Sequence, residues 1–386
     1  MMVEYLHTIL LVAIALMLLV VIVNVVGFPA LRKRRPSAPV PLVSVLMPVR
    51  NEEAVIGRAL EGVLKQDYPA YEVVVLDDNS TDRTGALAGE RARVDARVRL
   101  VQGQKLPRGW VGKAFACHQL AREAKGDLLL FIDADTMLAP GAISGGVEEL
   151  HRSSADLLTV IPRQHMSSFW EKVLLPLLHF STFCYLPMPL VSRTRSPKLA
   201  MANGQFMLFR KVAYAAIGGH ESVRDALVED VWLARRVKEE GLRLAIRYGG
   251  ELVECRMYTS LSEIWAGFSK NLFPGLGYSV PMITGVVLFS ILTSVLSFVL
   301  LVHYLILGEI GTGVGLLVAG EAGGVLLIRL LLSLRFDMNL WPILLHPVAV
   351  LVFVAIAVNS ALWVLTGRGS RWKGRVYGLR HDIANQ

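Results

Sequence analysis

Cysteine and charged residues are both scarce in this chain of 386 residues. Its three cysteines form no CxxC pair, which excludes a disulfide framework and a cysteine-rich zinc site. Charged residues make up 19%, against about 25% in an ordinary soluble domain, while apolar residues reach 53%. The apolar surplus must lie in long runs, so the composition argues against a wholly soluble protein and against a disordered one.

Two long stretches without a full charge predict membrane-spanning helices. The first, 5–31, is longer than a secretory h-region and lacks a basic n-region, so we expect a retained helix within residues 1–31. The second begins near Phe273 and predicts a C-terminal membrane region over 279–366. The three spans that fit this region are 279–305, 311–334 and 340–366.

Positive charge predicts how these segments are oriented. The basic run 32–35 follows the first span, so the positive-inside rule puts the N-terminus outside and the next domain in the cytoplasm. The net charge of +8 indicates anionic lipid head groups rather than nucleic acid as a partner. One span before the domain and three after it put the basic tail, 367–386, outside, although its charge argues for inside. Either one block is re-entrant or interfacial, or the rule fails for this tail.

Two charges lie inside the second predicted C-terminal span, at Glu321 and Arg329. Charges within a span are costly and usually face protein or water. They either line a path for a lipid acceptor, or they pair with other residues of the bundle or snorkel to the interface. We favour the second interpretation.

Between the membrane segments, residues 41–275 alternate strand-like and helix-like patterns, which predicts an α/β domain with a mostly parallel sheet. Ligands bind beyond the carboxyl ends of the strands in such sheets. Polar clusters follow three predicted strands and should converge on one crevice. The predicted strands are 43–49, 71–78, 97–102 and 127–135, the predicted helices are 54–66, 113–125 and one from about Thr81, and the clusters are 50–52, 77–79 and 133–135.

Carboxylates in two of these clusters suggest specific chemistry. Asp133 and Asp135 flank a small residue on an extended segment, where they could hold one divalent cation that neutralises a diphosphate. The alternative is a solvated turn. Asp78 could accept a hydrogen bond from a uracil N3–H, and the alternative for its cluster is helix capping by Asn79, Ser80 or Thr81.

Two further motifs have both a catalytic and a structural interpretation. Lys113, in GWVGK, offers a point charge to phosphate, or it is a solvated lysine that opens a helix. The run is not a Walker A loop. Glu229 and Asp230 fall in the first turn of a predicted amphipathic helix. They either favour the helix dipole, or one of them is a general base.

Two apolar segments flank this chemistry. The run 169–191 is interrupted by three prolines and predicts an interfacial segment on the bilayer rather than a span. Residues 260–273 predict an amphipathic helix that leads into the next span.

The order of these motifs resembles that of inverting family-2 glycosyltransferases over about residues 42–275. Some motifs look closer to a membrane subgroup that includes bacterial carotenoid-acid (diaponeurosporenoate-type) and hopanoid-associated glycosyltransferases and, more remotely, ceramide glucosyltransferases. The superfamily motifs are PVRNE, LDDNSTD, GWVGKAFA, LFIDADT, GQFMLFRK and VEDVWLARRVKEEG; those of the subgroup are GWxGK, ECRMY, WAGFSKNLF and WKGRVY.

The resemblance implies a GT-A (Rossmann-like) fold and a nucleotide-sugar donor, in particular a UDP-sugar. By matched position Asp78 would bind uracil, Val49 and Glu52 the nucleoside, and Asp230 would be the catalytic base. Asp135 would bind Mg²⁺ or Mn²⁺ with support from Asp133, while Lys113 would stabilise the leaving diphosphate and Glu229 would assist at the donor site. Processive members and ceramide glucosyltransferases carry Q/RxxRW near the membrane, whereas this chain has WAGFSKN there, which leaves Lys270 as a diphosphate partner.

We therefore expect a multi-pass membrane enzyme that transfers one sugar, at the cytoplasmic face, to a lipid acceptor. The acceptor classes to consider are a carotenoid acid, a hopanoid and a glycerolipid or sphingolipid. A processive polysaccharide synthase is the first alternative, and the missing QxxRW argues against it. A catalytically silent membrane scaffold is the second, and the intact DAD and ED motifs argue against that.

Overall fold

The computed structural model describes residues 1–35, 40–368, 370–373 and 375–377. By contacts between residues the chain forms two compact units, here called the helical unit and the sheet unit. Residues 166–187 and 258–275, which the sequence groups with the α/β domain, have most of their contacts within the helical unit. The helical unit comprises Met1–Gly27, Met166–Pro187 and Tyr258–Gln386, and the sheet unit comprises Phe28–His165 and Met188–Met257.

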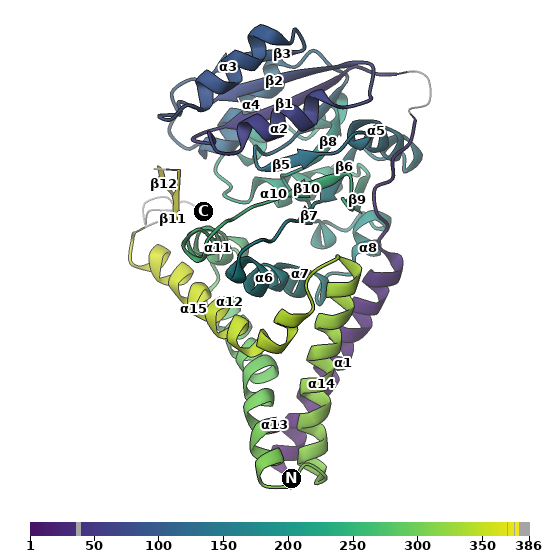
Figure 1. Ribbon diagram of the computed structural model, residues 1–386, viewed down its shortest axis with the longest axis vertical. Helices are drawn as coiled ribbons and strands as arrows, with labels where there is room; N and C mark the ends of the chain where they lie inside the picture. The colour runs from purple at the N-terminus through teal and green to yellow at the C-terminus, as the bar shows by residue number, and fades with distance from the viewer. Residues whose placement is uncertain (36–39, 369, 374, 378–386) are drawn as a thin grey trace. The chain divides into compact units, whose positions relative to one another are not determined.

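The sheet unit is built on a seven-stranded sheet with the order β3-β2-β1-β4-β8-β6-β9 (Figure 1). Strands β3, β2, β1 and β4 are parallel to one another, as the alternation predicts, whereas β8 is antiparallel to both of its neighbours. The seven strands are β1 (Val43–Val49), β2 (Tyr71–Asp77), β3 (Val98–Gln102), β4 (Leu128–Phe131), β6 (Leu157–Ile161), β8 (Met207–Arg210) and β9 (Leu244–Tyr248).

Helices surround this sheet, and its central strands are buried on both faces. Six of the seven residues of β1 are buried, which explains why its sequence is continuously apolar rather than alternating. A small second sheet has the order β5-β10-β7. The remaining elements are α2 (Ile56–Leu64), α3 (Thr84–Val94), α4 (Gly112–Glu123), α5 (Ala142–Arg152), α8 (Met188–Arg193), η1 (Pro197–Leu199), α9 (Lys211–Ala216), η2 (Gly219–Val223), α10 (Glu229–Glu239), β5 (Thr136–Leu138), β7 (Arg163–Gln164) and β10 (Val253–Cys255).

The register of the parallel strands brings their polar ends to one edge of the sheet. Val49 at the end of β1 pairs with Asp77 at the end of β2. The prediction of a strand over 127–135 is wrong at its C-terminal end, because β4 stops at Phe131. Asp133 and Asp135 instead lie in the turn between β4 and β5, which the amide of Thr136 closes by donating to the carbonyl of Asp133 at 3.1 Å.

The helical unit contains four helices long and apolar enough to cross a membrane: Met2–Gly27, Val280–Ile306, Gly313–Arg335 and Trp341–Leu365. These ranges confirm the four predicted hydrophobic helices. The unit's elements are α1 (Met2–Gly27), α6 (Phe169–Leu174), α7 (Pro176–Phe183), α11 (Leu261–Gly275), α12 (Val280–Ile291), η3 (Leu292–Leu296), α13 (Ser297–Ile306), α14 (Gly313–Arg335), η4 (Trp341–Leu345), α15 (His346–Leu365), β11 (Ser370–Trp372) and β12 (Arg375–Tyr377). The rest of the predicted basic tail, residues 369, 374 and 378–386, lies outside the described residues.

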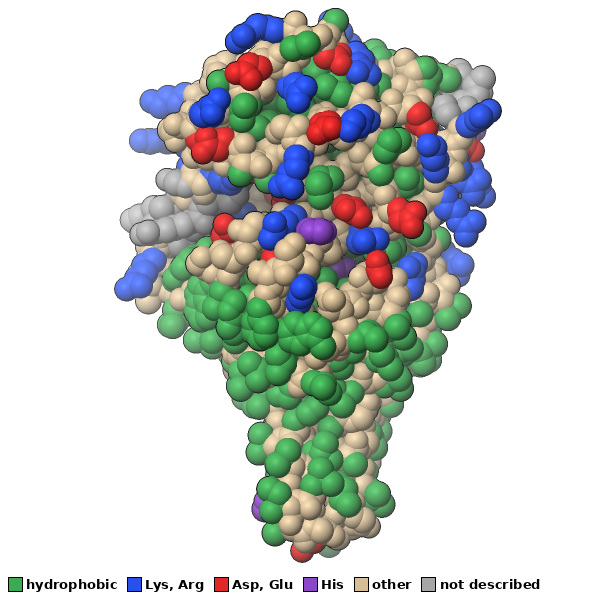
Figure 2. All heavy atoms as spheres, viewed as in Figure 1, with side chains coloured by type: hydrophobic (Ala, Val, Ile, Leu, Met, Phe, Trp, Pro, Cys, Tyr) green, Lys and Arg blue, Asp and Glu red, His purple; other side chains and the backbone are tan. Residues whose placement is uncertain are grey.

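The surface differs between the two units. Figure 2 shows hydrophobic side chains over the long helices of the helical unit, whereas Lys, Arg, Asp and Glu side chains gather over the sheet unit. The apolar run 169–191 forms three short helices, α6, α7 and α8, as expected of a proline-interrupted segment rather than a span.

One of the two charges inside α14 is paired, as the sequence interpretation favoured. Glu321 is fully buried, and its carboxylate oxygens lie 2.9 Å from Nδ1 of His7 on α1 and 2.7 Å from the hydroxyl of Ser297 on α13. This network joins three helices of the unit. Among the residues that the structure describes, Arg329 has no such pairing.

Candidate active site

The loops that follow β1 and β2 are held together by hydrogen bonds between them. The amide of Asn51 donates to the hydroxyl of Ser80 at 3.1 Å, and the amide of Thr81 donates back to the side chain of Asn51 at 2.8 Å. Asn51 and Asn79 have φ angles of 52° and 57°, a left-handed conformation that asparagine tolerates better than most residues. These exchanged bonds fix the shape of the edge where the strands end.

The three residues predicted to contact the nucleoside lie at this edge, with Val49 at the end of β1 and Glu52 and Asp78 in the loops. The carbonyl of Val49 accepts a hydrogen bond from the amide of Asp78 at 2.8 Å, and Asp78 is buried. The amide of Glu52 donates to the hydroxyl of Thr84 at 2.7 Å. The structure therefore brings Val49, Glu52 and Asp78 together, while their part in binding the base and ribose stays a prediction.

The predicted capping of the helix after β2 is wrong. This helix, α3, begins at Thr84 rather than Thr81, and its N-cap position is occupied by Arg83 without a side-chain cap. Asp82 accepts from the amide and hydroxyl of Thr84 instead, at 2.9 and 2.6 Å. The side chains of Ser80 and Asn51 serve the contact between the loops, which local sequence rules do not predict.

Lys113, the second residue of α4, bridges two acidic motifs. Its Nζ lies 2.8 Å from Oδ1 of Asp133 and 3.1 Å from Oε1 of Glu229. Burial alone would lower the pKa of Lys113, but the two carboxylates outweigh it and hold that pKa well above the ordinary value. The interpretation of Lys113 as a solvated lysine is wrong, because its side chain is half-buried and its ammonium is paired with two carboxylates.

Among the described residues, no lysine or arginine forms an ion pair with the carboxylate of Asp135 as Lys113 does with Asp133. Burial, followed by the nearby carboxylates of Asp133 and Glu52, raises the pKa of Asp135 to about 7, while Lys113 and a hydrogen bond from the Cys255 thiol oppose the rise. Excess negative charge held in this way is what a bound divalent cation would relieve.

Asp133 and Asp135 could hold a cation whose remaining coordination positions are filled by water and by a bound diphosphate. Among the residues that the structure describes, no group of three His, Cys, Asp or Glu side chains could hold a metal ion. Asp135 and Asp133 supply oxygen ligands of the kind that Mg²⁺ and Mn²⁺ prefer. Two carboxylates leave most of the coordination to water and to a diphosphate, which suits a metal that binds together with a nucleotide.

Asp230 lies at the start of α10 and is half-buried. Its Oδ2 accepts from the amide of Gly204 at 2.9 Å, and its Oδ1 accepts from the amide of Val231 at 2.8 Å. Burial and the neighbouring carboxylate of Glu229 raise the pKa of Asp230 to about 6, against the opposing effect of Lys113. A carboxylate with a pKa near neutrality can accept a proton at physiological pH and release it again.

Sequence reasoning missed two parts of this site. The first is the loop at Gly204, where an added Cβ would lie 2.8 Å from Nζ of Lys113. The second is Gln205, whose amide nitrogen lies 2.6 Å from Sγ of Cys255, so that this glutamine orients the thiol beside Asp135. Both belong to motifs noted above, GQFMLFRK and ECRMY, but residues of these types carry no chemical signal until the fold brings them beside the acids.

The predicted site residues thus fall into two groups. Eight of them lie in the sheet unit, whereas Lys270 lies on α11 in the helical unit, so its role as a diphosphate partner stays a prediction. The eight are Val49, Glu52, Asp78, Lys113, Asp133, Asp135, Glu229 and Asp230.

Comparison with known proteins finds glycosyltransferases. The family described as Glycosyl transferase family 2 matches residues 44–218. The 4,4'-diaponeurosporenoate glycosyltransferase of Staphylococcus aureus strain MRSA252 is 27% identical over 362 residues, covering 88% of this chain and 89% of the relative. The protein of the same name from strain USA300 is 28% identical over 354 residues, with the same coverage of both chains.

A solved structure supports the fold. The mannosyltransferase PcManGT from Pyrobaculum calidifontis, determined with GDP-Man and Mn²⁺, has a TM-score of 0.58 and 18% identity, covering 94% of this chain and 99% of its own. The GT-A fold that the sequence motifs imply is thereby confirmed, since the sheet unit has the mixed α/β architecture of this class. Residues 44–218 therefore match a glycosyltransferase family 2 domain, and this match together with the named relatives identifies the protein as a glycosyltransferase.

Proposed function

We propose that this glycosyltransferase transfers a single sugar from a nucleotide-sugar, in particular a UDP-sugar, to a lipid acceptor in the membrane. The observation that supports this most is the convergence of two acidic pairs on Lys113, which places candidate metal-binding and proton-accepting carboxylates in one site. The mannosyltransferase of similar fold was solved with a nucleotide-sugar and Mn²⁺, and the Staphylococcus aureus relatives are named for an apolar carboxylic acid.

In this proposal the residues after the parallel strands bind the donor. Asp78 accepts from the N3–H of the base, and Val49 and Glu52 contact the nucleoside. Asp135 and Asp133 hold Mg²⁺ or Mn²⁺, which when bound neutralises charge on the donor diphosphate. The ammonium of Lys113 adds positive charge from the same side, since it is already held against Asp133.

Asp230 acts as the general base for a hydroxyl acceptor. It removes the proton as the acceptor oxygen attacks the anomeric carbon, and direct in-line displacement inverts that carbon. Glu229, whose charge is satisfied by Lys113, keeps the ammonium in place. A carboxylate acceptor needs no proton removal, so the demand on Asp230 then falls.

The test is a screen of donors and lipids with the purified full chain, followed by mass spectrometry of the lipid fraction. We expect one lipid to gain the mass of one hexose in the presence of Mn²⁺ and a single UDP-sugar, and not in the presence of chelator. A ladder of products would favour a polymer synthase. Absence of UDP binding by calorimetry would remove the nucleotide-sugar part of the proposal.

We further propose that the protein is multi-pass and that its sheet unit faces the cytoplasm. The basic run 32–35 after α1 supports this orientation. Val94 is 81% exposed, and the three native cysteines are buried, so Val94→Cys adds one accessible thiol. We expect it to react with a membrane-impermeant reagent only after cell lysis. Labelling in intact cells would place the sheet unit outside.

A further inference from the structure

The second charge inside α14 is a buried cation for which the described residues supply no counterion. Arg329 is 1% exposed, and among the described residues its Nε and Nη1 have no hydrogen-bond partner. Glu321, on the same helix, is already paired with His7 and Ser297 and does not neutralise it. An uncompensated guanidinium within a membrane-spanning helix is costly and marks a site where an anion would be stabilising.

Two histidines of the helical unit are also buried with unpaired polar atoms. His179 on α7 is 5% exposed and His346 at the start of α15 is 0% exposed, and neither ring nitrogen of either residue has a partner in the described part of the chain. Aromatic rings enclose both, with Phe336 centred 4.7 Å from His179 and Phe180 centred 5.0 Å from His346. Burial, followed by the charge of Arg329, lowers the pKa of His179 to about 4, so its imidazole is neutral.

These three side chains define the chemistry of what they can bind. A guanidinium has five N–H donors and no acceptor, and a neutral imidazole offers one N–H donor. The missing partner is therefore an acceptor that carries negative charge. One positive charge with a neutral imidazole beside it matches a singly charged carboxylate better than a phosphate monoester, which carries up to two negative charges.

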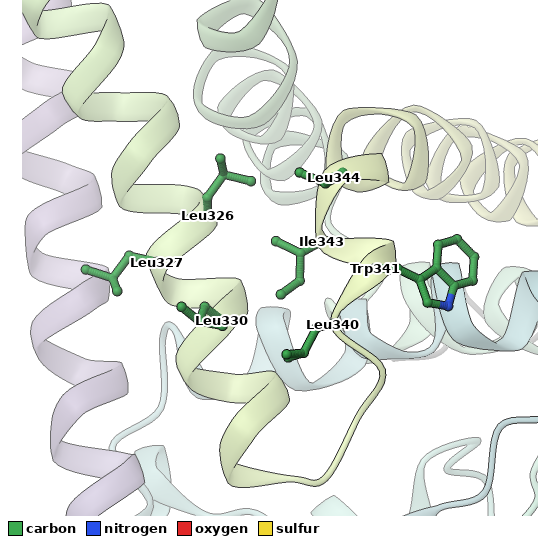
Figure 3. A pocket seen from close by; sticks show the side chains of 7 residues that line it. All are labelled: Leu326, Leu327, Leu330, Leu340, Trp341, Ile343 and Leu344. Atoms are coloured by element: carbon green, nitrogen blue, oxygen red, sulfur yellow. The ribbon is translucent and has the colours of Figure 1, made fainter.

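An apolar groove lies between α14 and the segment 340–344 that leads into α15. It has a volume of about 520 Å³, and Figure 3 shows Leu330 of α14 facing Leu340 and Ile343 of the segment that leads into α15. Arg329 directly precedes Leu330 in the chain, and His346 begins the helix that follows this segment. The seven lining residues are Leu326, Leu327, Leu330, Leu340, Trp341, Ile343 and Leu344.

We propose that Arg329, His179 and His346 bind the carboxylate of a long-chain apolar acid whose chain lies along this groove. Buried donors without acceptors explain the head group, and a groove lined by leucine, isoleucine and tryptophan explains the chain. The inference rests on the proposed function only in one respect, namely that such an acid would be the acceptor. Binding itself needs no donor and no transfer.

The test measures binding of radiolabelled palmitate to the full chain in phosphatidylcholine nanodiscs, without nucleotide-sugar. We expect saturable binding that unlabelled palmitate displaces and methyl palmitate does not. Arg329→Gln should weaken binding by about tenfold or more, the scale of a lost charge-assisted hydrogen bond. Arg368→Gln removes an exposed positive charge just beyond α15 in the same unit and should change affinity by less than about twofold.

A second variant and a second measurement guard against misfolding. His179→Phe keeps a ring within the aromatic cluster and removes the N–H donors, so it should weaken palmitate binding while Arg329 stays in place. In the unmodified protein palmitate should raise the melting temperature and methyl palmitate should not. Equal competition by the methyl ester, unchanged affinity in Arg329→Gln, or absence of saturable palmitate binding would each overturn the assignment. Because no donor is present, these outcomes are separate from failure of the sugar transfer.

Discussion

The acidic pair after β4 and the acidic pair at the start of α10 come from distant parts of the chain. In both pairs, however, one carboxylate is neutralised by a cation and the other is not. In each pair one carboxylate, Asp133 or Glu229, contacts the ammonium of Lys113. The other, Asp135 or Asp230, is left without that contact and has a raised pKa. One lysine therefore satisfies one member of each pair and leaves the other poised for a ligand or a proton.

The difference between the two pairs lies in what surrounds the poised carboxylate. Asp135 is next to two further acids and a thiol, an environment that favours a bound cation. Asp230 is half-buried and accepts two backbone amide hydrogen bonds, an environment that suits proton transfer. Similar sequence motifs thus acquire different chemistry from their neighbours in space.

The largest expected effect comes from Asp135→Ala, because it removes the carboxylate proposed to bind the cation directly. We expect turnover to fall by about 10³-fold, at the upper end of the cost of losing one electrostatic stabiliser. The dissociation constant for UDP should rise far more in Mn²⁺ than in chelator, which calorimetry measures. Equal UDP affinity of mutant and unmodified protein in Mn²⁺ would remove Asp135 from the metal site.

The next largest effect is expected for Asp230→Asn, which keeps shape and removes basicity. With a hydroxyl acceptor, turnover at saturating donor should fall by about 10²-fold or more, the usual scale of general base catalysis. UDP affinity and the melting temperature should survive. Glu229→Gln is the matched control and should cost less. Near-normal turnover of a folded Asp230→Asn enzyme would show that the base lies elsewhere.

The raised pKa of Asp230 predicts a pH dependence. A base must be deprotonated to act, and this pKa is about 6, so kcat/KM should rise as pH increases to 6 and level off above it. Each pH unit below that value should cost about tenfold, because the deprotonated fraction falls tenfold. The profile is measured with a hydroxyl acceptor at saturating Mn²⁺, and the acidic limb should be absent in Asp230→Asn. A limb that persists there would assign it to another group.

The smallest effect tests the bridge between the two pairs. Lys113→Met removes the positive charge that lowers the pKa of Asp230, so the acidic limb should move to higher pH. A shift of the limb by one pKa unit should itself lower kcat/KM at pH 7 by about twofold, because half of Asp230 is then protonated at that pH. Lys125→Met, at an exposed lysine just beyond the same helix, should leave the profile unchanged. An unshifted limb in Lys113→Met would show that the two pairs are independent.

The sequence by itself determined much of the architecture, because it depends on patterns that are local in the chain. Long apolar runs predict the four hydrophobic helices, and their ranges agree with the structure to within a few residues. The continuous runs of β1 and β2 and the acids in the first turn of α10 are likewise local signals. Parallel strands end at one edge, so even the convergence of the polar clusters follows from the β-α-β alternation.

Only the tertiary structure decided which charges are satisfied. The sequence cannot pair Lys113 with Asp133 and Glu229, because these lie 20 and 116 positions further along the chain. Nor can it show that Glu321 has partners while the described residues offer none to Nε and Nη1 of Arg329. It also extends β4 through Asp135, because the apolar run does not reveal the turn at which the strand ends. Local propensity depends on neighbours in sequence, whereas the energy of a charge depends on burial and on neighbours in space, and these exist only once the chain has folded.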